Sequence, residues 1–377
     1  QFVTGGFSGA TSVAIDLTHA FGQLENVESL LVLRRKKSTT SDKLATLEQR
    51  GIPYALISGV AHAITVYQLV KLCRKWKPDI LVAHGFPEHI LGRWAGLFAQ
   101  VPHWVQVEHN SRERYTSWKL WQSRFLSKKT RYSVGVSEGV TEVLRSQRLF
   151  SRIVAIPNGI DTDKFARHSQ NTIGQRPKDL IMVSRFAKSK DQMTLIKALG
   201  LLKARDICPN VSFFGGGSSR YLKKVQEHVV RYGLESQVSF CAHTPHVDQE
   251  LAAHKIFVMS SFYEGLNLSV LEAMASGCVV VGSDAVGVRE LIRDGDDGFV
   301  FKIGDSERLA NIIESILAAP ENFQSFADKA RLKAQQFYDK KHVNQAYQDL
   351  LLPLVTGRVN DENHMTRDIG QPSAQAR

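Results

Sequence analysis

Two glutamates, Glu264 and Glu272, stand with seven residues between them in a segment that is otherwise small, apolar or neutral, SFYEGLNLSVLEAMASG (261–277). A carboxylate in apolar surroundings needs a partner, and none is near in the sequence, so we expect the partner to be a ligand. The run at 256–259 has the composition of a buried strand, and a helix is predicted over 267–276. Glu264 then lies on the loop at the carboxyl end of the strand, and Glu272 lies within the helix.

Two cations follow another predicted strand, LIMVS (180–184). Arg185 comes directly after this strand, and Lys190 stands where the next helix begins. The carboxyl ends of parallel strands and the N-termini of the following helices converge on one ligand crevice. We therefore expect the two side chains to bind a diphosphate, the arginine through its planar fork and the lysine as a point charge. The alternative is a solvated basic loop.

Backbone donors complete the predicted anion site. The first-turn N–H groups of the helix that follows Gly265 have no partner within the helix, and with the two cations they would neutralise a diphosphate without a metal. The two carboxylates then remain to accept hydrogen bonds from sugar hydroxyls. The alternative, two surface acids on a helix, fits Glu272 poorly because its sequence neighbours are almost all apolar. The backbone donors belong to Leu266, Asn267 and Leu268.

Three weaker candidates also follow predicted strands. Gly6 and Gly9 belong to the glycine-rich stretch GGFSG, and Gly217 ends FFGGG. The first stretch does not match G-x-G-x-x-G, which argues against a dinucleotide. His109 follows VQVE, and a neutral imidazole can exchange a hydrogen bond with a hydroxyl. Each also has an ordinary structural explanation, which is a tight turn for the glycines and a buried side chain for the histidine.

The elements that must position these residues alternate along the chain. Short β-branched runs are separated by longer helical patterns in two series, at 29–156 and 180–282, with a polar, aperiodic stretch between them. Continuous apolar strands between helices predict parallel sheets that are covered on both faces. Two series in 377 residues predict two α/β domains. The expected parts are a first domain (1–165), a linker (166–178), a second domain (179–335), a helix packing back on the first domain (336–356) and a disordered tail (357–377).

Composition excludes several classes of protein. Hydrophobic residues make up 43% of the chain and charged residues 23%, as in soluble globular proteins. The four cysteines are scattered without metal-ligand spacing, which favours a reducing compartment and no structural metal. Neither a membrane-spanning run nor a signal peptide is apparent. The chain begins without Met, so we expect the first residues of the first strand to be missing.

Part of the net charge of +11 is concentrated at 112–131, where seven basic residues accompany one acid, Glu113. Trp118, Trp121 and Phe125 recur there at the spacing of one helix face. Aromatic residues flanked by cations suit the headgroup layer of an anionic membrane. The alternative is a helix whose aromatic face points into the core. No nucleic-acid-binding module is apparent, so we expect no nucleic-acid partner.

The order of these motifs resembles that of the retaining glycosyltransferases of the GT-B fold, specifically glycosyltransferase family 4. The resemblance extends over residues 1–350. The matching features are GGFSG, His109 after VQVE, IPNGIDTDKF (156–165), Arg185 with Lys190, FFGGG, and EGLNLSVLEAMASG with Glu264 and Glu272 at the E-x7-E spacing of the family.

The resemblance implies two Rossmann-like parallel-sheet domains that face each other across a cleft. The acceptor would bind the first domain, and a nucleotide-sugar donor would bind the second without a metal or other cofactor. Arg185 and Lys190 would hold the diphosphate, and Glu272 the ribose hydroxyls. The implied contacts to the rest of the donor come from Gly6, Gly9, Gly217, Glu264 with the backbone of 265–268, and His109, which would reach the sugar hydroxyls.

The resulting prediction is a retaining, metal-independent glycosyltransferase. It would move a hexose or N-acetylhexosamine from a UDP- or GDP-sugar to a cell-surface polysaccharide, a lipopolysaccharide or a glycolipid. We expect it in the cytoplasm, with peripheral contact to the inner face of the cytoplasmic membrane through 112–131. The alternatives are a nucleotide-sugar epimerase of the same fold, which needs no acceptor, and a non-catalytic sugar-nucleotide-binding subunit.

Overall fold

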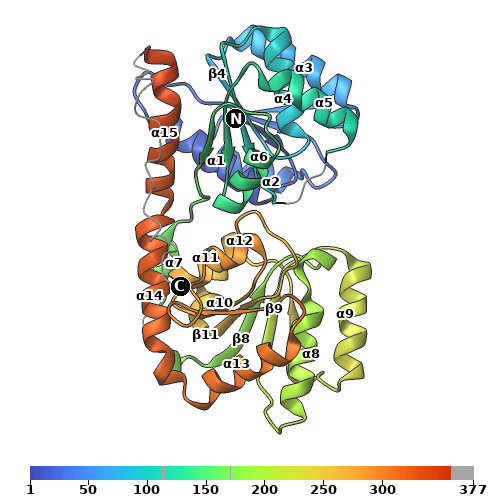
Figure 1. Cartoon of the computed structure of the whole chain (residues 1–377), viewed down its shortest axis with the longest axis vertical. Helices are drawn as coiled ribbons and strands as arrows, with labels where there is room; N and C mark the ends of the chain where they lie inside the picture. Colours follow the sequence, from blue (N-terminus) through green and yellow to red (C-terminus); the bar gives the residue numbers. More distant parts are fainter. Residues whose placement is uncertain (112–114, 170, 358–377) are drawn as a thin grey trace. The chain divides into compact units, whose positions relative to one another are not determined.

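The computed structural model describes residues 1–111, 115–169 and 171–357 (Figure 1). The chain divides into two compact units. Unit 1 comprises Gln1–Gly159 together with the chain from Lys340 onward, and unit 2 comprises Ile160–Asp339. Each unit contains a parallel sheet with helices, so the prediction of two parallel α/β domains is confirmed.

Unit 1 contains, in the described part of the chain, a seven-stranded parallel sheet of order β3-β2-β1-β4-β5-β6-β7. Strand β1 pairs with both β2 and β4, so the order of the strands reverses there. The strands are β1 (Phe2–Thr4), β2 (Leu31–Arg34), β3 (Tyr54–Ile57), β4 (Ile80–His84), β5 (His103–Glu108), β6 (Thr130–Gly135) and β7 (Ile153–Ala155). The helices are α1 (Gly9–Gly22), α2 (Ser41–Gln49), α3 (His62–Trp76), α4 (Glu88–Ala99), α5 (Ser117–Ser127), α6 (Glu138–Ser146) and α15 (Lys340–Thr356).

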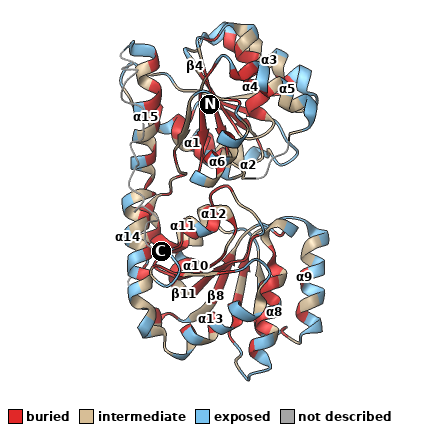
Figure 2. Cartoon of the chain, in the orientation of Figure 1, coloured by how far each residue is buried: buried red, intermediate tan, exposed pale blue. Residues whose placement is uncertain are grey.

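The central strands of this sheet consist mostly of buried residues (Figure 2). Phe2 belongs to one hydrophobic cluster, and the next residue, Val3, belongs to another. Leu31 and Val32 on β2 divide in the same way. Successive side chains of a strand point to opposite faces, so a sheet covered by helices on both sides requires the continuous apolar runs that the sequence contains.

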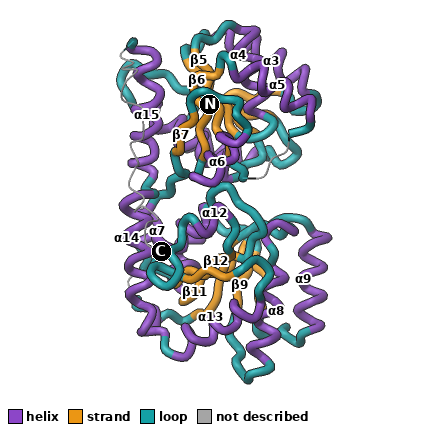
Figure 3. Tube along the Cα trace, viewed as in Figure 1, coloured by secondary structure: helices purple, strands orange, loops and turns teal. Residues whose placement is uncertain are grey.

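Unit 2 contains, among the described residues, a six-stranded parallel sheet of order β10-β9-β8-β11-β12-β13 (Figure 3). Strand β8 pairs with both β9 and β11, so the strand order reverses at β8. The strands are β8 (Lys178–Val183), β9 (Val211–Phe214), β10 (Val238–Cys241), β11 (His254–Met259), β12 (Val279–Ser283) and β13 (Phe299–Phe301). The helices are α7 (Thr162–Ala166), η1 (Ile173–Gln175), η2 (Lys188–Lys190), α8 (Gln192–Lys203), α9 (Ser219–Arg231), α10 (Val247–Ala253), α11 (Leu268–Ala275), α12 (Val286–Arg289), α13 (Ser306–Ala318), η3 (Pro320–Phe323) and α14 (Gln324–Phe337).

The segment that we expected to link the domains, 166–178, contains a buried anchor for unit 2. The guanidinium of Arg176 donates hydrogen bonds to the carbonyls of Ser276 and His254, each at 2.8 Å, and to Ser169 Oγ at 2.9 Å. The boundary between the units falls at 159/160 rather than after 165. The polar, aperiodic sequence of this segment gives no signal of a buried arginine, because its partners come from distant parts of the chain.

The C-terminal helical region is divided into two helices. The chain leaves α14 at Phe337, and the backbone N–H of Ile160 donates to the carbonyl of Tyr338 at 2.9 Å. Helix α15 then packs against α1 in unit 1. The expected disordered tail lies, apart from Gly357, outside the described residues.

Candidate functional site

The predicted donor residues of unit 2 follow three neighbouring strands. Arg185 follows β8, the glycines of FFGGG follow β9, and Glu264 follows β11. These strands are adjacent in the order β9-β8-β11. Because parallel strands end at the same edge of a sheet, the three loops gather there, at the point where the strand order reverses.

The loops after β8 and β9 continue the pairing of their strands. The N–H of Phe186 donates to the carbonyl of Gly216 at 2.7 Å, and the N–H of Ser218 donates to the carbonyl of Phe186 at 3.0 Å. Gly217 has φ +142°, and a Cβ there would lie 2.5 Å from the oxygen of Phe186. The glycine therefore permits a close approach that only glycine tolerates. The backbone of Arg185 also lies beside the glycine loop, since a Cβ on Gly215 would lie 3.6 Å from its nitrogen, and its side chain is exposed.

The loop after β8 is also attached to the loop after β11. The N–H of Phe262 donates to the carbonyl of Ser189 at 2.9 Å, and Ser260 Oγ donates to the carbonyl of Asp191 at 2.7 Å. The attachment brings the ammonium of Lys190 into an ion pair with the carboxylate of Glu264.

Glu264 therefore has protein partners in this structure. Ser261 Oγ donates to Glu264 Oε1 at 2.6 Å, and Lys190 Nζ donates to the same oxygen. The expectation that a ligand is the partner of both carboxylates is wrong for Glu264, because its cation comes from a loop 74 residues away in the sequence.

Glu272 lies on α11 and is half-buried. Among the described residues, its carboxylate has no hydrogen-bond partner. Burial raises the pKa of Glu272 to about 7, and the charge of Lys164 on α7 only partly opposes this shift. The carboxylate is thus an acceptor whose solvation is incomplete, and its role in binding a ligand stays a prediction.

The first turn of α11 differs in one respect from the prediction. The N–H of Asn267 is not an unpaired donor, because it donates to the carbonyl of Gly287 at 3.1 Å. This carbonyl comes from the segment after β12, which approaches closely: a Cβ on Gly287 would lie 2.2 Å from the oxygen of Gly265. In the described part of the chain, the N–H groups of Leu266 and Leu268 have no such acceptor.

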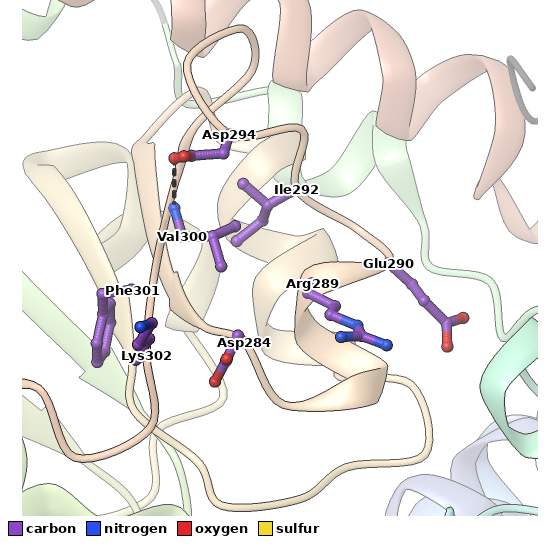
Figure 4. A pocket seen from close by; sticks show the side chains of 8 residues that line it. All are labelled: Asp284, Arg289, Glu290, Ile292, Asp294, Val300, Phe301 and Lys302. Atoms are coloured by element: carbon purple, nitrogen blue, oxygen red, sulfur yellow. Dashed lines mark hydrogen bonds between the residues drawn. The ribbon is translucent and has the colours of Figure 1, made fainter. Parts of the chain in front are cut away.

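A cavity of about 500 Å³ lies at the carboxyl ends of β12 and β13, around α12 (Figure 4). Arg289, Lys302 and Asp284 contribute charged side chains to its lining. The dashed line in Figure 4 marks the hydrogen bond from the N–H of Val300 to Asp294 Oδ1, at 2.8 Å. None of the predicted site residues lines this cavity.

His109 in unit 1 follows β5 and contacts a second histidine. Its Nε2 lies 3.3 Å from Nδ1 of His84, the last residue of β4, and His84 Nε2 lies 2.8 Å from Gln1 Oε1. Burial lowers the pKa of His109 to about 4 and that of His84 well below its usual value, so both rings are neutral at neutral pH. With the Gln1 oxygen as acceptor, His84 carries its proton on Nε2. His109 then donates to His84 Nδ1 and keeps its own Nδ1 as an acceptor.

The N-terminal glycine loop lies near His109. A Cβ on Gly85 would lie 4.0 Å from both Ala10, in the first turn of α1, and the ring of His109. Gly6 has room for a side chain, and Gly9 is the first residue of α1. Among the predicted residues, Gly6, Gly9 and His109 belong to unit 1, whereas Arg185, Lys190, Gly217, 264–268 and Glu272 belong to unit 2.

Sequence reasoning missed the polar side chains that surround His109. His84, His89 and Glu108 are all buried in unit 1. For His84 and Glu108, the sequence signal was a polar residue at the end of an apolar strand. His89 lies on α4 and had no such signal. No group of three or more His, Cys, Asp or Glu side chains within 1–111, 115–169 and 171–357 is arranged to hold a metal ion. No helix in these ranges is long and apolar enough to cross a membrane.

Two parallel α/β sheets, with a cationic loop and paired acids at the strand ends of the second, define a protein of the GT-B class. Residues 7–164 match the sequence family described as Glycosyltransferase Family 4, and residues 163–333 match the family Glycosyl transferases group 1. Together the two matches span almost the whole described chain. The chain belongs to the family-4 type of glycosyltransferases, as its motifs predicted.

Relatives agree with this assignment, and a solved structure shares the fold. The glycosyltransferase EpsD of Bacillus subtilis (strain 168) is 30% identical over 51% of this chain, and the match spans 54% of EpsD, about half its length. The Escherichia coli UDP-Gal:alpha-D-GlcNAc-diphosphoundecaprenol alpha-1,3-galactosyltransferase is 24% identical over 69% of this chain and 70% of that protein. The structure of Anabaena Alr3699/HepE with UDP has a TM-score of 0.79 at 22% identity, covering 93% of this chain and 98% of that one.

Proposed function

We propose that this protein transfers a sugar from a nucleotide-diphosphate donor to a saccharide or lipid-linked acceptor, with retention of anomeric configuration and without a metal. The observation that carries the proposal is Glu272, a half-buried carboxylate on α11 of unit 2 without a hydrogen-bond partner among the described residues. A ribose diol offers two hydroxyl donors to such a group. The fold match to a UDP-bound structure supports the same ligand class.

The diphosphate would bind between cations and backbone donors. Arg185 is exposed at the end of β8, and Leu266 and Leu268 present N–H groups just before and at the start of α11. Cleavage of the donor bond develops negative charge on the departing diphosphate, and fixed donors stabilise that charge in the transition state. Lys190 would stabilise the same negative charge, and its ion pair with Glu264 fixes its position.

The donor sugar would contact Glu264 and the backbone of 265–268. The Glu264 carboxylate is fixed in orientation because it accepts hydrogen bonds from Lys190 and Ser261. A fixed acceptor suits the recognition of a sugar hydroxyl. The donor is a UDP- or GDP-linked hexose or N-acetylhexosamine in this proposal. In unit 1, the neutral ring of His109 would accept a hydrogen bond from a hydroxyl through Nδ1.

The acceptor would belong to cell-surface polysaccharide, lipopolysaccharide or glycolipid synthesis. The name of the Escherichia coli relative specifies a diphosphoundecaprenol acceptor, and that of a relative from Rhizobium meliloti (strain 1021) specifies lipopolysaccharide core biosynthesis. The latter is 27% identical over 58% of this chain and 62% of its own length. A lipid-linked acceptor in the cytoplasmic leaflet would require the protein to work at a membrane surface.

An exposed aromatic surface on α4 and α5 is a candidate for membrane contact. Five rings stack in sequence with centroids 4.8 to 6.2 Å apart, and we name them the aromatic column: Phe98, Trp94, Phe125, Trp121 and Trp118. Trp118, Trp121 and Phe125 are 65%, 52% and 49% exposed. The alternative of a core-facing aromatic stripe is therefore wrong, because α5 buries a different face, through Ser123 and Leu126.

The charges around the aromatic column suit an anionic surface. Residues 115–131 contain no acid, and Lys119, Arg124, Lys128 and Lys129 lie among them. Arg112, Glu113 and Arg114 lie outside the described residues. Exposed aromatic area with a basic rim fits the headgroup layer of a membrane that contains anionic lipid. We propose that the aromatic column rests on such a surface while unit 1 receives the acceptor.

A panel of nucleotide sugars tests the transferase proposal. Purified protein is mixed with each UDP- or GDP-sugar, and the thermal shift and the release of free nucleotide are measured with and without undecaprenol-diphosphate saccharides. One donor is expected to stabilise the protein and to be hydrolysed slowly alone and faster with an acceptor. Conversion of the donor to an epimer without release of nucleotide would support the epimerase instead, and binding without turnover would support a non-catalytic subunit.

A further inference from the structure

A buried carboxylate holds the backbone of the loop that carries His109. Glu108 is the last residue of β5 and is 7% exposed. Its Oε1 accepts hydrogen bonds from the N–H groups of His109 at 3.0 Å and Asn110 at 3.2 Å. The strand pairing ends at this point, so the side chain of Glu108 replaces the next strand partner for these two donors.

The opposite oxygen of Glu108 is held by His89 on α4. His89 Nε2 lies 3.4 Å from Glu108 Oε2. His89 Nδ1 lies 3.2 Å from Nη2 of Arg93, which can only donate. His89 therefore accepts through Nδ1 and carries its proton on Nε2, where it donates toward Glu108 and the hydroxyl of Tyr115 at 3.0 Å.

Arg93 is fixed in turn by groups on α4, α5 and β6. Its Nε donates to the carbonyl of His89 at 3.0 Å, and its Nη2 donates to Ser123 Oγ at 3.0 Å. Nη1 lies 3.4 Å from Thr130 Oγ1. The side chain is 1% exposed, so the guanidinium has few other orientations available. The tautomer of His89 is therefore imposed by a rigid, buried donor.

The pKa values of Glu108, His89 and Arg93 are consistent with these contacts. Burial would raise the pKa of Glu108, but the hydrogen bonds from the His89 side chain and from the backbone N–H of His109 outweigh it and lower that pKa overall. Burial lowers the pKa of Arg93 to about 10, so it stays charged at neutral pH, and burial lowers the pKa of His89, so it stays neutral. A buried cation and a buried carboxylate are thus bridged by a neutral imidazole.

We propose that Glu108 is a positioning residue for His109, and that His89 and Arg93 act through it by fixing the orientation of its carboxylate. The proposal rests on the proposed function, because it assumes that His109 contacts substrate. The carboxylate fixes the main chain behind the histidine, while His84 contacts the ring at 3.3 Å. A displacement of about 1 Å in a substrate-contacting group can cost about 10²-fold in rate.

The variant Glu108→Gln tests the proposal with the smallest change in shape. A glutamine cannot accept from the two backbone N–H groups and from His89 Nε2–H at once, because one of its two ends is an NH₂ donor. We expect kcat to fall by about 10²-fold with little change in KM for the donor, whose nucleotide binds unit 2. Glu138→Gln is the matched control, because Glu138 forms an exposed ion pair with Arg145 in the same unit.

A pair of substitutions at His89 separates positioning from packing. The amide of His89→Gln can place an N–H where Nε2–H stands, so this variant is expected to keep most of the wild-type kcat. His89→Leu fills similar space without a donor and is expected to resemble Glu108→Gln. Equal losses in both variants would overturn the role assigned to the hydrogen bond, and so would wild-type turnover by Glu108→Gln.

A spectroscopic measurement makes the result independent of activity. With ¹⁵N-labelled histidine in the full chain, the ring nitrogens of His109 are expected to shift in Glu108→Gln and to stay unchanged in Glu138→Gln. The His109 signals are assigned by their loss in His109→Gln. If the wild type turns over no nucleotide sugar, the proposed function fails while this readout still tests the placement of His109. Unchanged His109 signals in a folded Glu108→Gln protein would overturn the positioning role.

Discussion

At the level of single residues, the proposed donor site of unit 2 contains two acids in different states. Glu264 is already paired with Lys190 and Ser261, whereas Glu272 is half-buried with its pKa raised to about 7. The E-x7-E spacing is symmetric in sequence, but the two carboxylates differ in what they have available for a ligand. Glu272 is the group whose ionisation a bound ribose would change.

This difference predicts a pH dependence of nucleotide binding. Ribose hydroxyls donate to the ionised carboxylate of Glu272, so binding favours the ionised form and lowers its pKa. Below the free-state pKa of about 7, binding must release a proton, and the affinity for UDP or GDP is expected to rise with pH and to level off above that value. Titration calorimetry across this range checks it. In Glu272→Gln the affinity should be weaker and its dependence on pH through this range should disappear.

The cations of the loop after β8 give a second prediction at this scale. Arg185→Ala and Lys190→Ala are each expected to lower kcat by about 10²–10³-fold, because each removes a fixed donor from the departing diphosphate. Lys188→Ala, which removes an exposed lysine from the same short helix η2, is the matched control. Steady-state turnover of the donor identified in the panel measures all three, and wild-type kcat in Arg185→Ala would contradict its assignment.

At the scale of elements, the loops after β8, β9 and β11 act as one assembly. Backbone hydrogen bonds join Phe186 to Gly216 and Phe262 to Ser189, so the position of each loop depends on its neighbours. Close packing against the loop after β8 is therefore a sufficient reason for glycine at Gly215 and Gly217. Gly217, which we predicted as a donor-binding residue, has a structural reason for being glycine that the sequence alone did not reveal.

Substitutions in FFGGG separate the two explanations. Gly217→Ala is expected to weaken nucleotide binding and to cost about 1–3 kcal/mol of stability, because its φ is +142° and the new Cβ would lie 2.5 Å from the oxygen of Phe186. Gly216→Ala should behave like the wild type in stability, because a Cβ there meets no atom within 4 Å. Denaturant unfolding and nucleotide titration check both variants. If Gly217→Ala and Gly216→Ala had equal free energies of unfolding, the close approach at Gly217 would not be the reason that glycine is required there.

For the molecule as a whole, the proposed membrane-binding surface of unit 1 is linked to the proposed substrate-contacting residue His109. The aromatic column and the basic residues of 115–131 lie on helices that pack together, α4 and α5. Through Ser123 and Arg93, α5 is also attached to the hydrogen bonds behind His109. The surface proposed to meet a membrane and the residue proposed to meet the substrate therefore share one buried anchor.

Vesicle binding tests the proposed membrane surface. The protein is expected to sediment with vesicles containing anionic lipid and to remain in solution with neutral vesicles. Replacing Trp118 and Trp121 by serine should abolish sedimentation, because these exposed rings supply the apolar contact. Replacement of Tyr67, an exposed aromatic residue on α3 outside the aromatic column, is the control. Equal binding to anionic and neutral vesicles would contradict the proposed role of the basic residues in binding anionic lipid.

Much of the site could be predicted because its residues stand at the ends of apolar strands. Arg185 and Glu264 were placed at one edge of a sheet by counting strands alone, and the structure places them after the adjacent strands β8 and β11. The prediction for the N–H of Asn267 was wrong, since its acceptor is Gly287, twenty residues further along the chain. Glu108 was missed because a buried polar residue and a strand-end surface residue have the same appearance in sequence.

Hydrophobic periodicity is enough to predict the two parallel sheets and the chemistry offered at their strand ends, because it records which side chains must leave water. Which polar group each charge meets is visible only in the folded protein. Lys190 pairs with Glu264, Glu108 receives His89, and Arg176 anchors the segment expected to be a linker. Such pairings depend on loop geometry and on distances of a few ångströms between residues far apart in the chain, and no local pattern encodes them.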